Sequence, residues 1–213
     1  FGFDAERNPA YLTLALGAGS TTPLQMAGAY AVFANGGYRI SPYIISKVTD
    51  SDGKVLSEAR PERAGVEANR VIDARNAFLV DSMLKDVVRH GTATKALSLK
   101  RTDIAGKTGT TNDSIDAWFA GYNPKLVGIA WIGYDQPKNL GNRETGGGLA
   151  LPIWIGYMSK ALKGEEVVER EVPPGLILAN GEYYYAETPP GTGVATLDVG
   201  PPPAPAEQKQ RDA

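Results

Sequence analysis

Three apolar segments with strand-like alternation follow one another at about residues 103–110, 116–122 and 126–134, and only short polar turns separate them. Alternation with a period of two indicates half-buried strands. Connections this short join antiparallel neighbours, because a parallel pair needs a crossover of a dozen or more residues. The sequence therefore predicts a three-stranded antiparallel meander. A chain of 213 residues with 42% hydrophobic residues is long enough to bury one substantial core around it.

A helix is predicted between Thr22 and about Asn35. Thr22 is suited to cap it, Pro23 to occupy its first position, and Gln25 to complete a capping box three residues after the cap. The glycine pair at 36–37 then ends it. The preceding residues, 12–20, are predicted to form a loop of small residues.

Two more helices are expected beside the predicted sheet. Asp73 caps one of about residues 74–90, and Gly146–Gly148 opens another of about 149–162, where Pro152 falls in the tolerant first turn. The expected fold class is thus α/β (α+β), an antiparallel sheet flanked by helices. Smaller expected elements are a strand at 42–48 with a hairpin turn at Asp52-Gly53, a helical piece at 92–97, and a hairpin around Asn180-Gly181.

The first predicted strand of the meander carries the sequence Lys107-Thr108-Gly109-Thr110. Thr108 and Thr110 are two residues apart and therefore share a face, which places Lys107 on the opposite one. Gly109 has no side chain, so a peptide-like ligand is able to approach the strand edge. A cation and hydroxyls together suit a carboxylate, which they bind through charge-assisted hydrogen bonds.

Composition excludes several classes of function. The net charge of −2 and the pI of about 5.5 provide no electrostatic footprint for nucleic acid. The sequence has no apolar run of 18 residues, so no membrane contact is expected of this segment. It has no cysteine and a single histidine, His90, which excludes thiolate and multi-histidine metal sites. No metal or cofactor is therefore expected, and His90 is interpreted as a cation near the end of a helix.

Other candidate motifs have simpler interpretations. Gly106-Lys107-Thr108 resembles the end of a phosphate-binding loop, but Arg101 stands where that loop needs its first glycine. Asp113 and Asp116 are paired carboxylates that suit acid–base work, although turn chemistry is the preferred interpretation. Core packing is expected of the three tryptophans, Trp118, Trp131 and Trp154.

Four segments together resemble the C-terminal half of the transpeptidase domain of class A (bifunctional) penicillin-binding proteins, type 1a-like. They are Leu14–Ala34, Gly91-Thr92-Ala93, Asp103–Tyr122 and Gly146–Trp154. The order of these segments, with Lys107–Thr111 followed by Asp116–Tyr122, makes the resemblance specific. It implies part of the transpeptidase fold shared by penicillin-binding proteins and serine β-lactamases.

The resemblance also implies a chemistry. In this family a serine of a Ser-x-x-Lys motif attacks the D-Ala-D-Ala end of a peptidoglycan stem peptide, an amine takes over the acyl group, and β-lactams trap the serine. By resemblance Lys107 is a catalytic residue that lines the site electrostatically. Thr108, Gly109 and Thr110 form the substrate-binding segment, and the backbone N–H of Thr110 is one oxyanion-hole donor. The implied location is the periplasmic face of the bacterial inner membrane.

The family's nucleophile is not expected in this chain. Ser-x-x-Lys occurs at Ser51–Lys54, on a turn, and at Ser82–Lys85, on the helix face opposite the apolar stripe of Leu79, Val80, Met83 and Val87. The turn at Ser51–Lys54 has no helix to put its serine and lysine on one face, and the Ser82–Lys85 face is interpreted as solvated surface. The nucleophile is expected upstream, in an N-terminal half that also leads to a membrane anchor and a glycosyltransferase domain. This chain alone is therefore expected to be inactive.

Alternatives remain open at this point. A D,D-carboxypeptidase or β-lactamase-type hydrolase, and a non-catalytic penicillin-binding envelope scaffold, both fit the same residues. The predicted organisation is a transpeptidase part at 1–162, an extension with a short hairpin at 163–187, and a disordered tail rich in Pro and Gly at 188–213.

Overall fold

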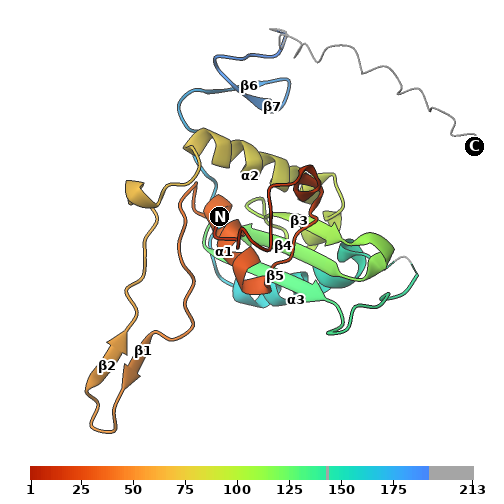
Figure 1. Cartoon of the computed structure of the whole chain (residues 1–213). Coiled ribbons are helices and arrows are strands. Elements are labelled where there is room, and N and C mark those ends of the chain that lie inside the picture. The colour runs from red at the N-terminus through yellow and green to blue at the C-terminus, as the bar shows by residue number, and fades with distance from the viewer. Residues whose placement is uncertain (143, 192–213) are drawn as a thin grey trace, which may run out of the picture. The chain divides into compact units, whose positions relative to one another are not determined.

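The computed structural model, shown in Figure 1, describes residues 1–142 and 144–191. For residue 68 only the backbone is described. The chain divides after Pro174 into two compact units. The first unit therefore includes twelve residues beyond the boundary predicted after residue 162, and the three-part division of the chain stays a prediction. Most of the segment predicted as a disordered tail, residues 192–213, lies outside the described residues.

The predicted meander is confirmed. Strands β3 (Ala105–Thr110), β4 (Ala117–Asn123) and β5 (Leu126–Ile132) form an antiparallel sheet in the order β3-β4-β5. The register places Thr108 opposite Phe119, and Phe119 opposite Ala130. Strand β3 is thus an edge strand among the described residues, with β4 on one side only.

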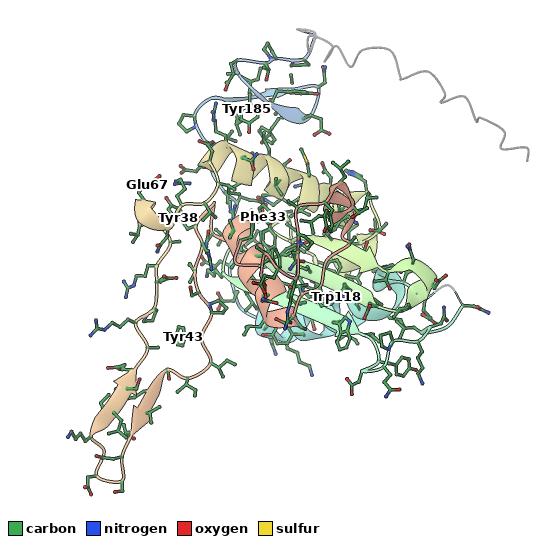
Figure 2. The ribbon with its side chains drawn as sticks, viewed as in Figure 1. Phe33, Tyr38, Tyr43, Glu67, Trp118 and Tyr185 are labelled. Atoms are coloured by element: carbon green, nitrogen blue, oxygen red, sulfur yellow. The ribbon has the colours of Figure 1, made fainter. Side chains whose placement is uncertain are left out.

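Helices pack on both faces of this sheet, as predicted. Helix α3 (Leu151–Ala161) shares a buried cluster with Phe119 and Ala130, which point to the same face. On the other face, Phe33 and its neighbours on α1 (Pro23–Ala34) pack near Ala105 and Tyr122 (Figure 2). Helix α2 (Ala74–Arg89) contributes side chains to both clusters.

A row of three glycines makes room for aromatic side chains on the α3 side, Gly106 for Phe119 and the other two for Trp154. Gly106, Gly121 and Gly128 are aligned across the three strands. A Cβ atom on Gly121 or Gly128 would lie 2.8 Å or 2.7 Å from the Trp154 indole. The indole Nε1 donates to the Gly128 carbonyl at 3.0 Å, and Trp154 is buried. Core packing is confirmed for Trp154, whereas Trp131 is 39% exposed, so core packing is wrong for it.

The local start and stop signals of the helices are confirmed. Thr22 and Gln25 form the capping box of α1, and Pro23 occupies its first turn. The Asp73 carboxylate accepts from the backbone N–H of Arg75 at the start of α2. A wide helical turn over Gly146–Ala150 precedes α3.

Smaller elements follow the predictions less closely. The strand expected at 42–48 is reduced to β1 (Lys47–Thr49), which pairs with β2 (Val55–Glu58) across the predicted turn. Part of the expected loop 12–20 forms a 3₁₀ turn at Leu12–Leu16, and another such turn lies at Thr94–Leu99. Further short turns lie at Glu67–Asn69 and Asn112–Ser114. The hairpin of the second unit, β6 (Leu176–Ala179) with β7 (Glu182–Tyr185), is confirmed.

An extended segment after α3, residues 163–173, is named here the C-terminal strap. Arg101 Nη1 and Nη2 donate to the carbonyls of Glu165 and Glu166 at 2.7 Å and 2.9 Å. At the far end of the strap, Arg170 donates to the carbonyls of Phe33 and Ala34 at the end of α1. The strap therefore joins the residues before β3 to α1.

Candidate functional site

The outer edge of β3 presents backbone groups that β4 does not use. The N–H of Thr111 donates to the Asp116 carbonyl at 3.1 Å and continues the β3–β4 register by one residue. Antiparallel pairs alternate between bonded and non-bonded residues, so Gly109 and Lys107 bond to β4, whereas Thr108 and Thr110 direct their N–H and C=O groups outward. Among the described residues no strand pairs with them.

Lys107 reaches this edge although alternation places it on the other face. Its Nζ donates to the carbonyl oxygen of Thr108 at 2.9 Å, and the residue is exposed. The long side chain therefore bends along the strand and brings the ammonium beside the outward backbone. The ammonium of Lys107 therefore lies at the same edge as the outward backbone of Thr108, although the two side chains start on opposite faces.

Each threonine hydroxyl of β3 has one protein partner. The Oγ1 atoms of Thr108 and Thr92 lie 2.6 Å apart. Thr110 Oγ1 accepts from the backbone N–H of Gly146 at 3.1 Å. A hydroxyl has one donor hydrogen and two acceptor positions, so each threonine keeps hydrogen-bonding capacity for a ligand.

Two loops border the edge, the one after α2 that contains Thr92 and the one that contains Gly146. Gly146 lies so close to the sheet that a Cβ atom on it would be 2.4 Å from the Gly109 carbonyl and 2.2 Å from that of Trp118. Its neighbour Gly147 accepts from Lys95 Nζ at 3.3 Å. Sequence reasoning gave Thr92 no role at the site and took Gly146 only as the opening of the last helix, although both belong to segments that carry the resemblance. Each of them lies in a short motif that contains glycine. The strand that each motif contacts is far away in the sequence, so the local pattern does not reveal the contact.

The second Ser-x-x-Lys match does not lie on solvated surface. Lys85 is 8% exposed, and its Nζ lies 3.3 Å from an Asp81 oxygen and 3.0 Å from a Glu169 oxygen. Met83, assigned to the buried stripe, is 63% exposed. The prediction for Lys85 was wrong because its charge is compensated by Asp81 on the same helix and by Glu169 on the strap, which apolar periodicity does not detect.

Asp113 and Asp116 lie in and beside the turn between β3 and β4. The Asp116 carboxylate accepts from Trp131 Nε1 at 2.8 Å, and the backbone N–H of Asp116 donates to Thr111 Oγ1 at 2.7 Å. Asp113 has a φ of 58°, in the left-handed region that aspartate tolerates in turns. Figure 2 labels Trp118 on this part of the sheet, and its ring centroid lies 6.0 Å from that of Trp131.

Behind the edge, the residues that lead into β3 are fixed by buried charges. Asp103 is 1% exposed and accepts from Arg101 Nε at 2.9 Å, from Arg101 Nη2 at 2.7 Å and from the N–H of Val168 at 3.1 Å. Burial by itself raises the pKa of Asp103, but these hydrogen bonds and the Arg101 charge outweigh it, so its pKa lies below the ordinary value.

Glu169 of the strap ties the same region to α2. One of its oxygens accepts from the Thr102 hydroxyl and the other from Lys85 Nζ. The Thr102 hydrogen bond, followed by the contact with Lys85, holds the pKa of Glu169 below its usual range despite partial burial. The start of β3 is thereby connected to α2 through the strap.

Comparison with known proteins identifies the fold. Residues 5–154 match the model of the penicillin-binding protein transpeptidase domain. The chain belongs to the penicillin-binding protein transpeptidase family. Penicillin-binding protein 1A of Neisseria meningitidis serogroup A is 48% identical over 207 residues, which are 96% of this chain and 26% of that protein. Penicillin-binding protein 1A of Pseudomonas aeruginosa is 43% identical over 222 residues, 83% of this chain and 27% of that protein.

Solved structures agree with this assignment. Penicillin-binding protein 1A of Haemophilus influenzae has a TM-score of 0.80 at 37% identity over 88% of this chain and 35% of that chain. A ceftriaxone acyl-enzyme of penicillin-binding protein A from M. tuberculosis has a TM-score of 0.55 at 25% identity, over 72% and 37%. The expected fold is confirmed as the penicillin-binding protein transpeptidase fold. The chain spans about a quarter of the length of its curated relatives.

No helix among the described residues combines the length and apolar character that crossing a membrane requires. No group of three or more His, Asp or Glu side chains there is arranged to hold a metal ion.

Proposed function

We propose that this chain is the C-terminal part of the transpeptidase domain of a peptidoglycan D,D-transpeptidase, within a bifunctional glycosyltransferase/transpeptidase. The observation that carries the proposal is the outer edge of β3. There the Lys107 ammonium, the hydroxyls of Thr108 and Thr110 and their outward N–H groups meet beside a strand without a second neighbour among the described residues. This is a donor-rich edge suited to an extended peptide that ends in a carboxylate.

The proposed ligand is the D-Ala-D-Ala end of a stem peptide, or a β-lactam in its place. Its carboxylate accepts from the hydroxyls of Thr108 and Thr110 in the field of Lys107. Gly109 leaves the strand edge open for its backbone. The N–H of Thr110 donates to the oxygen of the attacked carbonyl, where negative charge develops. Such a donor typically contributes about 3 to 4 kcal/mol to lowering the barrier, because it is oriented before the reaction begins.

The covalent steps are proposed to occur on a serine upstream of this chain. Its oxygen forms an ester with the penultimate D-Ala carbonyl carbon, the peptide bond to the last D-Ala breaks, and that D-Ala leaves with the proton. An amine on a neighbouring peptidoglycan strand then forms the new amide and releases the serine. With a β-lactam the opened ring stays attached and the serine is trapped.

The upstream half is also proposed to carry a membrane anchor, which would place this domain on the periplasmic face of the inner membrane. Ser82 is not proposed as the nucleophile, because the lysine that follows it is bound by Asp81 and Glu169. Ser51 and Lys54 lie at the exposed turn between β1 and β2.

The test is to incubate this 213-residue chain with a labelled penicillin and to measure its intact mass. We expect no adduct from this chain and a stoichiometric adduct from the full-length protein. An adduct on the short chain would place the nucleophile within it and contradict the proposed division of the site. With the full-length enzyme, release of D-Ala without cross-linked product would favour a carboxypeptidase over a transpeptidase.

A further inference from the structure

The loop after α2 places a hydroxyl against the candidate site. Thr92 Oγ1 lies 2.6 Å from Thr108 Oγ1, a normal distance for a hydrogen bond between hydroxyls, and the two residues are 16 apart in sequence. Thr92 is exposed, so this contact is not a by-product of burial in the core.

The position of Thr92 is fixed from both sides. The N–H groups of Gly91 and Ala93 each donate to the Val87 carbonyl at 3.1 Å, and Ala93 is completely buried. On the other side, a Cβ atom on Gly147 would lie 3.0 Å from the Thr92 carbonyl oxygen and 3.7 Å from Thr108 Cγ2. The loop is thus anchored to the end of α2 and lies close to both β3 and the glycine turn.

An anionic ligand determines the direction of the hydrogen bond between the two hydroxyls. An ionised carboxylate accepts hydrogen bonds and cannot donate. When it binds Thr108, the Thr108 hydrogen has to point to the ligand, and its oxygen is then free to accept from Thr92. Thr110 has the same arrangement, since its oxygen accepts from the N–H of Gly146 at 3.1 Å and its hydrogen stays available.

We propose that Thr92 is a positioning residue of this site, whose hydroxyl donates to Thr108 Oγ1 and directs the Thr108 hydrogen toward the ligand carboxylate. The inference rests on the proposed function and adds to it a residue outside the Lys107–Thr110 segment. Linked hydrogen bonds polarise one another, so the donation from Thr92 strengthens the one that Thr108 makes to the ligand. The pair favours a ligand with a free carboxylate over one whose carboxylate is esterified.

The experiment compares three variants of the full-length protein with the wild type. Thr92→Val keeps the side-chain shape without the hydroxyl, Thr92→Ser keeps the hydroxyl, and Thr94→Val, on the same loop, is the matched control. The probes are a penicillin with a free carboxylate and its methyl ester, and the readout is the second-order rate constant of acylation by intact mass.

With the free acid, we expect Thr92→Val to lower the rate constant about three- to tenfold, the loss typical of one neutral hydrogen bond. Thr92→Ser is expected to restore it and Thr94→Val to leave it unchanged. With the ester, wild type and Thr92→Val are expected to react equally, because it has no ionised carboxylate for Thr108 to bind. A general loss of structure would instead slow both probes alike. In a Thr108→Val background, Thr92→Val is expected to have no further effect.

Equal losses for acid and ester, or no loss with Thr92→Val, would overturn the positioning role. If Thr108→Val slows acylation while Thr92→Val does not, the inference fails and the proposed function stands. If the wild-type full-length protein forms no adduct, the proposed function fails and the inference fails with it.

Discussion

The residues that lead into strand β3 carry buried charges, whereas the outer edge of the strand carries the exposed charge of Lys107. At its start, Asp103 and Arg101 have side chains that are 0% and 10% exposed, and the strap lies against them. At its outer edge, Lys107 is exposed, and its ammonium donates to the Thr108 carbonyl. Buried charges need compensation inside the protein, whereas exposed ones are available to a ligand. The start of the strand therefore supports the fold, and the outer edge is available for binding.

The largest expected effect comes from removing the buried charge at the start of β3. Asp103→Ala leaves Arg101 without its bidentate partner in a buried position, which is expected to destabilise the domain by about 3 to 5 kcal/mol. The measurement is chemical denaturation of this domain within the full-length protein. The matched control is Asp86→Ala, whose ion pair with Arg89 is exposed. A similar small effect of both substitutions would remove the distinction between the two ends.

The next effect is expected at the outer edge, and on activity rather than on stability. Lys107→Ala in the full-length protein is expected to slow acylation by labelled penicillin about 10- to 100-fold, because a charge-assisted contact with the carboxylate is lost. The free energy of unfolding is expected to stay the same, since Lys107 is exposed. Lys47→Ala on the β1–β2 hairpin is the control. Unchanged acylation in the Lys107 variant would count against the site assignment.

A smaller effect is expected from acid. The pKa values of Asp103 and Glu169 are both lowered in the folded protein, so their contribution to stability is complete above about pH 4.5, near the unfolded pKa values. It is lost as the pH falls through the lower folded values. Glu169→Gln is expected to remove about 1 kcal/mol at neutral pH, since Glu169 is half-exposed.

The check on this third prediction is the free energy of unfolding between pH 7 and pH 3, in the wild type and in Glu169→Gln. The variant is expected to lose less stability on acidification, because one of the two titrating carboxylates is absent. Parallel curves for the two proteins would show that the strap carboxylate does not stabilise the start of β3.

The last prediction concerns a substitution that is expected to have no effect on acylation. Ser82→Ala in the full-length protein is expected to leave acylation by penicillin unchanged, because Lys85 is bound by Asp81 and Glu169 and belongs to the supporting charges. Loss of the penicillin adduct in this variant would move Ser82 and Lys85 from the supporting region to the reactive site, and the comparison of the two ends would have to be redrawn.

The sequence by itself determined the elements whose signals are local. The capping box of Thr22 and Gln25, the short turns of the meander and the alternation of its strands lie within a few residues of one another, and the structure has them as predicted. The Lys107–Thr110 segment was also recognisable, since four consecutive residues carry its chemistry.

Only the tertiary structure decided which distant residues serve that segment. Thr92 and Thr108 are 16 residues apart, Thr110 and Gly146 are 36 apart, and Lys85 and Glu169 are 84 apart. Periodicity reports which side of a helix is apolar, but not whether a charge on it will be compensated by another segment. Lys85 was therefore misplaced, because one of the two carboxylates that compensate its charge, Glu169, comes from the strap, and only packing brings that carboxylate beside it.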